Sequence, residues 1–198
     1  MKKINFVIHP LTIFFVFLLT GCSSKPDVVH DLSNKDYTLI NTNSSVVHFP
    51  RDFKEKTVVL GFIYTHCPDI CPMTTHNINL VKKELNKTGA SDVTYVCISF
   101  DPERDTPAVL KEYAEVRGIN TKEFHFLTGD KSEIQSLLKD CNIYALPGDT
   151  IVVDSDTSYF YIHTDRISVM DPDGKIRAEY KGSTANREEL IKDINRIR

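Results

Sequence analysis

The sequence has no excess of basic residues, few cysteines and no apolar run long enough to span a membrane. Its 198 residues contain 24 Lys and Arg against 27 Asp and Glu, so no nucleic-acid partner is expected. Five cysteines are too few for a small domain held together by disulfides. With 41% hydrophobic and 26% charged residues, the composition is typical of a globular protein and excludes a disordered chain. The length suits one compact domain with an appendage.

The first 22 residues have the pattern of an export signal. Two lysines precede an apolar stretch, residues 4–19, which ends in the motif Leu-Thr-Gly-Cys at residues 19–22. This ending resembles the lipobox of bacterial lipoproteins, which implies cleavage before Cys22 and lipid attachment to its sulfur and its new amino terminus. The stretch has about 16 residues, whereas a spanning helix needs about 20, so a plain transmembrane anchor is the less favoured alternative.

The pattern divides the chain into a signal peptide at residues 1–21, the lipidated Cys22 with a polar tether at residues 22–35, and a working domain at residues 36–198. We expect the domain to be lipid-anchored at the cell membrane and to face the periplasm or the extracytoplasmic side, where disulfides persist. The sequence leaves open whether an inner or an outer membrane holds the lipid.

Strands and helices alternate along the predicted domain. Apolar, β-rich runs at residues 57–64 and 93–100 predict buried central strands. Shorter strands are expected at residues 37–40, 46–48, 124–127, 151–153, 159–163, 167–170 and 175–180. Helices are expected after the first central strand, from Thr106, from a cap formed by Asp130 and Glu133, and from Asn186. This order predicts an α/β, thioredoxin-like fold with a mixed central sheet flanked by helices and an N-terminal hairpin extension.

Cys67 and Cys71 lie where a buried strand is expected to end and a helix to begin. Helical side chains four residues apart share a face with their Cβ atoms about 5–6 Å apart, so these thiols can form a disulfide or bind one metal ion. The free amides and the dipole of a helix start favour the thiolate. Pro68 and Pro72, however, remove two of the amide donors. The pair alone leaves both chemistries open.

Three segments together resemble the Sco/SenC family of exported copper proteins, which help to assemble cytochrome c oxidase. They are THCPDICP at residues 65–72, FDPERDTP at residues 100–107, and YIHT at residues 161–164 with MDPDG at residues 170–174. The resemblance covers about residues 36–198 and implies that Cys67, Cys71 and His163 bind copper. Thiolates select Cu(I), and imidazole suits either Cu(I) or Cu(II).

One position departs from the family pattern. The family usually has Asp before this histidine and Ser after it, whereas Ile162 and Thr164 stand there in this sequence. Threonine is a conservative replacement for serine. Ile162 removes a carboxylate that could tune the neighbouring ligand or contact a partner.

The resemblance implies a membrane-tethered metallochaperone that delivers copper to the binuclear copper centre of cytochrome c oxidase. Its partner would be the copper-centre subunit of that terminal oxidase, with another copper chaperone or a thioredoxin-like reductant as further candidates. A carrier is therefore favoured over an enzyme. The alternative is a thiol–disulfide oxidoreductase that reduces the acceptor's cysteines, in which the catalytic residues are Cys67, which attacks, and Cys71, which resolves. A peroxide-reducing enzyme is disfavoured because the segment before Cys67 lacks the proline of the Pro-x-x-x-Thr-x-x-Cys pattern.

Three charged residues are candidates for supporting roles around the metal ligands. Asp101 and Arg104 are expected either to orient the cysteine loop or only to build the turn before the next helix. Asp69 is expected to be exposed and is a candidate for partner recognition. His66 and His76 are expected not to be ligands. Cys97 and Cys141 are expected to be separate buried thiols, although a disulfide between them is an alternative.

Overall fold

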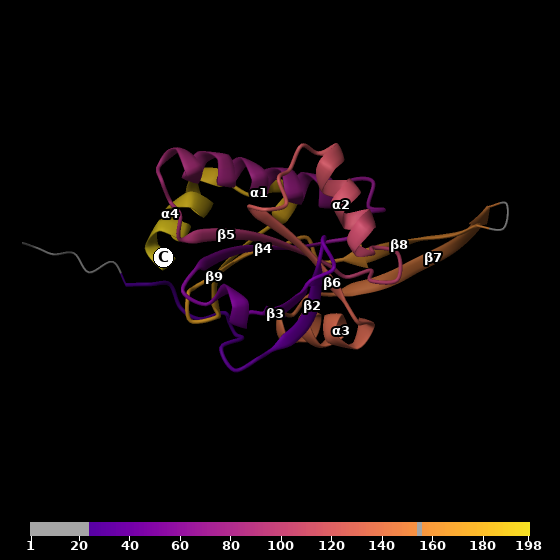
Figure 1. Cartoon of the computed structure of the whole chain (residues 1–198), viewed down its shortest axis with the longest axis horizontal. Coiled ribbons are helices and arrows are strands. Elements are labelled where there is room, and N and C mark those ends of the chain that lie inside the picture. The colour runs from indigo at the N-terminus through magenta and orange to yellow at the C-terminus, as the bar shows by residue number, and fades with distance from the viewer. Residues whose placement is uncertain (1–23, 154–155) are drawn as a thin grey trace, which may run out of the picture.

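The structure is a computed structural model that describes residues 24–153 and 156–198 (Figure 1). The expected signal peptide and the predicted lipidation site, Cys22, lie outside the described residues. Among the helices of the described part of the chain, none combines the length and the apolar character needed to cross a membrane.

A mixed, eight-stranded sheet forms the centre of the fold, which confirms the predicted fold class. The strands follow the order β1-β10-β9-β4-β5-β6-β2-β3, with β4, β5 and β6 parallel at the middle and the other pairings antiparallel. The predicted hairpin is present at one edge as β2 and β3. The strands of this sheet are β1 (His30–Asp31), β2 (Tyr37–Asn41), β3 (Val46–Phe49), β4 (Thr57–Ile63), β5 (Val93–Ser99), β6 (Phe124–Gly129), β9 (Ile167–Met170) and β10 (Lys175–Tyr180).

Helices flank both faces of the sheet. Figure 1 shows α1, α2 and α4 on one side of it and α3 on the other. The helices are α1 (Ile70–Lys87), α2 (Pro107–Val116), α3 (Lys131–Asp140) and α4 (Arg187–Ile197). The expected caps at Thr106 and Asn186 are confirmed, because each side chain accepts hydrogen bonds from the backbone of the first helical turn.

The expected cap of α3 is only half right. The helix begins after Asp130, as predicted, but the Asp130 side chain forms no capping hydrogen bond. The Glu133 carboxylate does not turn back to the helix start either, because it accepts a hydrogen bond of 2.9 Å from the Thr38 amide of β2. The donor belongs to a strand that packs against α3, so the sequence around the helix start could not predict this contact.

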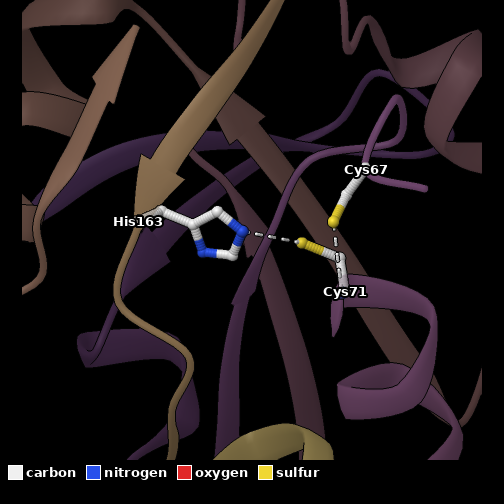
Figure 2. A group of neighbouring side chains, drawn as sticks. All are labelled: Cys67, Cys71 and His163. Carbon is white, nitrogen blue, oxygen red and sulfur yellow. Dashed lines mark hydrogen bonds between the residues drawn. The ribbon is translucent and has the colours of Figure 1, made fainter. Parts of the chain in front are cut away.

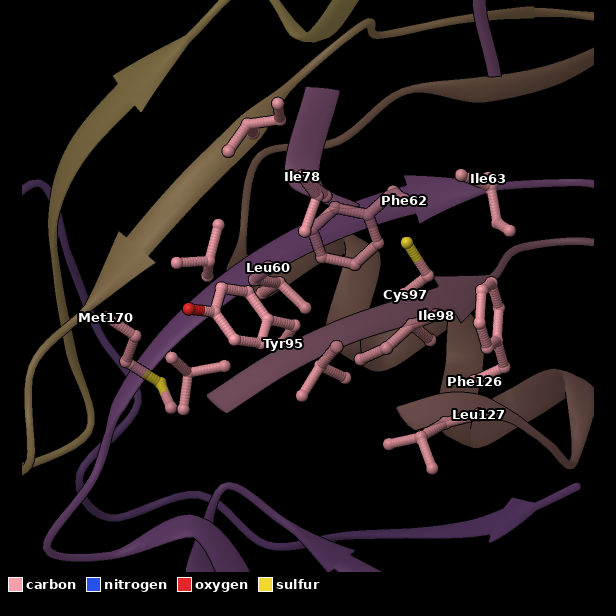
Figure 3. Close-up of a cluster of buried hydrophobic side chains, with 14 of the residues drawn as sticks. Leu60, Phe62, Ile63, Ile78, Tyr95, Cys97, Ile98, Phe126, Leu127 and Met170 are labelled. Atoms are coloured by element: carbon pink, nitrogen blue, oxygen red, sulfur yellow. The ribbon is translucent and has the colours of Figure 1, made fainter. Parts of the chain in front are cut away.

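The core lies on both sides of β4 and β5, every residue of which is buried (Figure 3). Helix α1 approaches β4 closely at Gly61. A Cβ atom at this position would lie 2.8 Å from Cδ1 of Ile78 and 3.3 Å from Sγ of Cys97, so a larger residue would force the Ile78 side chain to shift. This close packing sets the position of α1, and with it the position of Cys71 in its first turn.

Two further strands form a separate antiparallel hairpin. They are β7 (Ala145–Val153) and β8 (Asp156–His163), and they extend away from the central sheet in Figure 1. The sequence predicted strands at residues 151–153 and 159–163 but not their pairing into a second sheet. His163 ends β8 and pairs with Ala145 at the base of this hairpin, next to the central sheet.

Regular structure begins before Asp36, the residue at which the working domain was expected to start. His30 and Asp31 pair with β10, and Leu32 is completely buried. A strand of two residues is too short to be predicted from hydrophobic periodicity. Leu32 is the residue of this segment that packs into the core. The segment is ordered by its contact with β10, which lies more than a hundred residues further along the chain.

Candidate metal centre

The two cysteines of the candidate site come from a loop and from the helix that follows it. β4 ends at Ile63 and α1 begins at Ile70, so Cys67 lies in the connecting loop and only Cys71 lies on the helix. The expected geometry of two cysteines on one helical face is therefore wrong. The loop instead turns Cys67 back onto the helix start, where the Cys71 amide donates a hydrogen bond of 3.4 Å to Cys67 Sγ. Both thiols are buried and free, and Cys67 is the more exposed of the two.

His163 joins the two cysteines from the other side of the site (Figure 2). Its Nε2 lies 3.6 Å from Cys71 Sγ, and the potential donor atoms of Cys67, Cys71 and His163 all lie within 4.8 Å of one another. His163 Nδ1 lies 3.0 Å from the Thr164 carbonyl oxygen. Because a carbonyl only accepts, Nδ1 carries a proton, so in the neutral imidazole the Nε2 lone pair faces the sulfurs.

Aromatic side chains hold the imidazole in place. The His163 ring centroid lies 4.9 Å from that of Phe100 and 5.6 Å from that of Tyr64. Tyr161, two residues earlier on β8, packs edge-on against both of these rings. This aromatic support is not predictable from the sequence, because its members lie at the ends of three strands that are distant in the chain.

The three groups of the site have unlike protonation states in the metal-free protein. Hydrogen bonds from the Cys71 thiol, from His163 and from the amides of Cys71 and Asp69 lower the pKa of Cys67 despite its burial. The hydrogen bond that Cys71 donates to Cys67 raises the pKa of Cys71, and burial raises it further. Burial opposes the charged form of His163, but hydrogen bonds to Cys67 and to the Thr164 carbonyl outweigh it and raise its pKa. The site therefore presents one thiolate beside one thiol.

A buried carboxylate that was not among the candidate site residues holds the cysteine loop. Asp105 Oδ2 accepts hydrogen bonds from the Thr65 amide at 3.0 Å and from Ser99 Oγ at 2.5 Å, and its Oδ1 accepts from Thr65 Oγ1 at 2.6 Å. Burial raises the pKa of Asp105 in spite of these bonds. The motif at residues 100–107 contains several acidic residues, and nothing in the local pattern indicates which of them faces the loop.

Asp101 and Arg104 hold β8, and the Arg104 guanidinium also lies 5.8 Å from the centroid of the Tyr64 ring, at the start of the cysteine loop. The two side chains form an ion pair, and Asp101 Oδ1 accepts hydrogen bonds from the hydroxyl groups of Tyr159 and Tyr161. The Arg104 guanidinium lies 3.7 Å from the centroid of the Tyr159 ring. The Asp101 carbonyl also accepts the amides of Arg104 and Asp105, so this segment builds the turn before α2, as one alternative predicted.

The other candidates lie outside the donor cluster. Asp69 is exposed, as expected, and its side chain does not cap α1. His66 and His76 are exposed, and neither belongs to the cluster. Cys97 and Cys141 are separate buried thiols, which confirms that prediction.

The fold and this site define a thioredoxin-like domain with a candidate Cys-Cys-His metal centre. Two sulfurs and one imidazole nitrogen suit soft or borderline metal ions and are a poor set for magnesium or calcium. The SCO1/SenC family model matches residues 27–198. The chain belongs to this family, which confirms the resemblance seen in its motifs.

Relatives of known structure share this fold. The copper-bound ScoI of Bradyrhizobium japonicum is 32% identical with a TM-score of 0.70, and the match covers 82% of this chain and 97% of that one. BsSco, described as a member of the Sco family of cytochrome c oxidase assembly proteins with a disulfide switch, is 27% identical with a TM-score of 0.68, covering 88% and 97%. A SCO1/SenC family lipoprotein of Bacillus anthracis is 26% identical with a TM-score of 0.70, covering 85% and 95%.

Curated relatives differ in length. The SCO1 protein homolog of Bacillus subtilis is 30% identical over 195 residues, which is 95% of both chains. The chain spans only about half the length of the mammalian mitochondrial relatives that it matches, from 46% to 58%.

Proposed function

We propose that this protein binds one copper ion through Cys67, Cys71 and His163 and delivers it to the binuclear copper centre of cytochrome c oxidase. The observation that carries the proposal is the convergence of these three donor atoms within 4.8 Å, with the Thr164 carbonyl bonded to Nδ1 so that Nε2 of the neutral imidazole is the atom that faces the sulfurs. The copper-bound relative from Bradyrhizobium japonicum supports the choice of metal.

The protonation states suggest how the site receives its metal. The Cys67 thiolate is ready to bind, whereas Cys71 loses its proton when the metal arrives, so loading releases protons. Three protein ligands leave room for an incoming thiolate of the acceptor. Cys67 is 7% exposed and Cys71 only 1%, so exchange would begin on the Cys67 side.

We also propose that the domain acts outside the cytoplasm on a lipid anchor at Cys22. The export-signal pattern that ends at Cys22 and the lipoprotein relative from Bacillus anthracis support this. The acceptor would be the copper-centre subunit of the oxidase, with a copper chaperone or a thioredoxin-like reductant as the upstream partner.

A second candidate function is thiol–disulfide exchange, favoured by the low pKa of Cys67 beside the protonated Cys71. The Cys67 thiolate would attack a disulfide of the acceptor and form a mixed disulfide, releasing one acceptor thiolate. Cys71, after losing its proton, would then displace the second. The acceptor would gain two thiols, and this chain would gain a disulfide between Cys67 and Cys71.

Counting the metal distinguishes the two functions. The reduced protein is loaded with copper without oxygen, excess metal is removed, and copper per chain is measured. We expect one copper per chain, lost in Cys67→Ala and in Cys71→Ala but retained in Cys141→Ala, which removes a buried thiol outside the site. His163→Ala should weaken Cu(II) binding more than Cu(I) binding, because two thiolates remain for the softer ion. No retained copper, together with a dithiol that cycles against glutathione, would favour the oxidoreductase.

A further inference from the structure

The loop that carries His163 is fastened to the helix that carries Cys71. Asp165, two residues after the histidine, accepts a hydrogen bond of 2.9 Å at Oδ1 from the Thr74 hydroxyl. Thr74 lies on α1, within one turn of Cys71, and is 2% exposed. The bridge thus joins the segment of the nitrogen donor to the element of one sulfur donor, across 91 positions of sequence.

A second segment closes over this bridge. The amide of Ser183 donates to both Asp165 oxygens, at 3.0 and 3.1 Å, and the Ser183 hydroxyl donates to Oδ2 at 2.5 Å. A Cβ atom at Gly182 would lie 2.6 Å from both Asp165 Oδ1 and Thr74 Oγ1, so glycine is needed for this close approach. Asn77 of α1 donates to the carbonyl oxygens of Gly182 and Ser183 and holds the segment against the helix.

We infer that Asp165 is a positioning residue that sets the distance between the His163 nitrogen and the two sulfurs. The Thr164 carbonyl selects the tautomer of the imidazole, but it moves with the same loop and does not locate the ring relative to α1. Phe100 and Tyr64 pack against the ring itself, and the bridge from Asp165 to Thr74 ties the histidine loop directly to α1. The inference rests on the proposed copper site and adds to it the residue that holds the third ligand in place.

Removing the bridge should affect one copper state more than the other. The sulfur donors lie on α1 and on the loop before it, and neither depends on Asp165 for its position. A displaced imidazole therefore lowers affinity for Cu(II), which needs the nitrogen donor, more than for Cu(I), which the thiolates hold. Loss of a residue that orients a metal ligand typically lowers metal affinity by about 10- to 100-fold.

Matched variants distinguish two possible roles of the Asp165 side chain. It could hold the histidine loop through its hydrogen bonds, or it could act through its negative charge. In Asp165→Asn, the amide oxygen can still accept from Thr74 and from the Ser183 amide, while the NH₂ group donates to the Ser183 hydroxyl. Asp165→Ala removes the bridge altogether. At the other end, Thr74→Val removes the hydroxyl but keeps the shape of the side chain, and Thr74→Ser keeps the hydroxyl. Thr88→Val is the control, because it removes a hydroxyl bonded to Leu85 at the far end of α1.

The experiment measures Cu(II) and Cu(I) affinities of the purified protein and its variants. We expect Asp165→Ala and Thr74→Val to bind Cu(II) about 10- to 100-fold more weakly and to keep Cu(I) affinity within about threefold. Asp165→Asn, Thr74→Ser and Thr88→Val should resemble the wild type in both states. Unchanged Cu(II) affinity in folded Asp165→Ala, or equal losses in the two copper states, would overturn the inference. Asp165→Asn that is as weak as Asp165→Ala would assign the effect to charge and would also overturn it.

Amide hydrogen exchange of the copper-free protein gives a second readout that does not depend on metal. The amide of Ser183 and those of the loop that follows His163 should exchange at least about tenfold faster in Asp165→Ala than in Asp165→Asn. If the wild type binds no copper, the proposed function fails, while this comparison still decides whether Asp165 holds the loop. Equal exchange in the two variants would show that it does not.

Discussion

Removing the Asp105 carboxylate should destabilise the protein through the loop before Cys67. Asp105→Ala deprives the Thr65 amide, the Thr65 hydroxyl and the Ser99 hydroxyl of their shared acceptor. The two hydroxyl groups can rotate toward other partners, but the Thr65 amide is fixed by the backbone. One donor is therefore left unpaired in a partly buried site.

The size of the effect follows from these contacts. An unpaired buried donor costs about 1–3 kcal/mol, and hydrogen bonds to a charged group contribute about 1.5–3 kcal/mol each. Part of this is offset, because the variant no longer buries the charge whose desolvation raises the pKa of Asp105. We expect a net loss of about 3 kcal/mol, which lowers Tm by about 6–12 °C in a domain of this size.

Asp105→Asn provides the matched comparison. Its amide oxygen can take the place of Oδ2 and accept from the Thr65 amide and Ser99, while its NH₂ group donates to the Thr65 hydroxyl. We therefore expect a loss of only about 1 kcal/mol. Asp92→Ala is the surface control, since it removes only an exposed ion pair with Arg198 that is worth at most about 1 kcal/mol.

Urea unfolding of the copper-free protein at neutral pH measures all three variants. The reasoning is refuted if Asp105→Ala loses no more stability than Asp92→Ala. It is also refuted if Asp105→Asn loses as much as Asp105→Ala, because the acceptor geometry would then not account for the cost.

Two other predictions test the site and the start of the fold. Because the pKa of Cys67 is lowered, its thiolate persists across neutral pH, so its alkylation rate should stay flat from about pH 6 to 9 and fall only in stronger acid. Mass spectrometry of alkylated peptides measures this; a tenfold rise per pH unit, as for an ordinary thiol, would contradict it. Leu32→Ala should cost about 2–5 kcal/mol in urea unfolding, because this side chain is fully buried. Val29→Ala, at a half-exposed position nearby, should change stability by less than about 0.5 kcal/mol, and equal effects would mean that Leu32 is not part of the core.

Much of the architecture could be predicted from local patterns. The apolar runs of β4 and β5 indicate buried strands because period and composition depend only on neighbours in the chain. The helix starts at Thr106 and Asn186 were equally predictable, since a cap bonds to the backbone of the next turn. The motif residues Cys67, Cys71 and His163 pointed to the family and to the donor set before any distance was known.

Local patterns and motifs were thus enough to predict the fold class, the family and the three candidate ligands, whereas the contacts that hold those ligands depend on segments that meet only in the folded chain. Asp101 and Asp69 were as plausible as Asp105 in the sequence, but only Asp105 meets the Thr65 backbone, 40 positions away. Asp165 meets Thr74 across 91 positions. The role of each carboxylate depends on the hydrogen-bond donors around it in the folded chain, and those donors come from distant segments. Apolar periodicity can be seen in the sequence itself, but polar groups from distant segments become neighbours only when the chain folds.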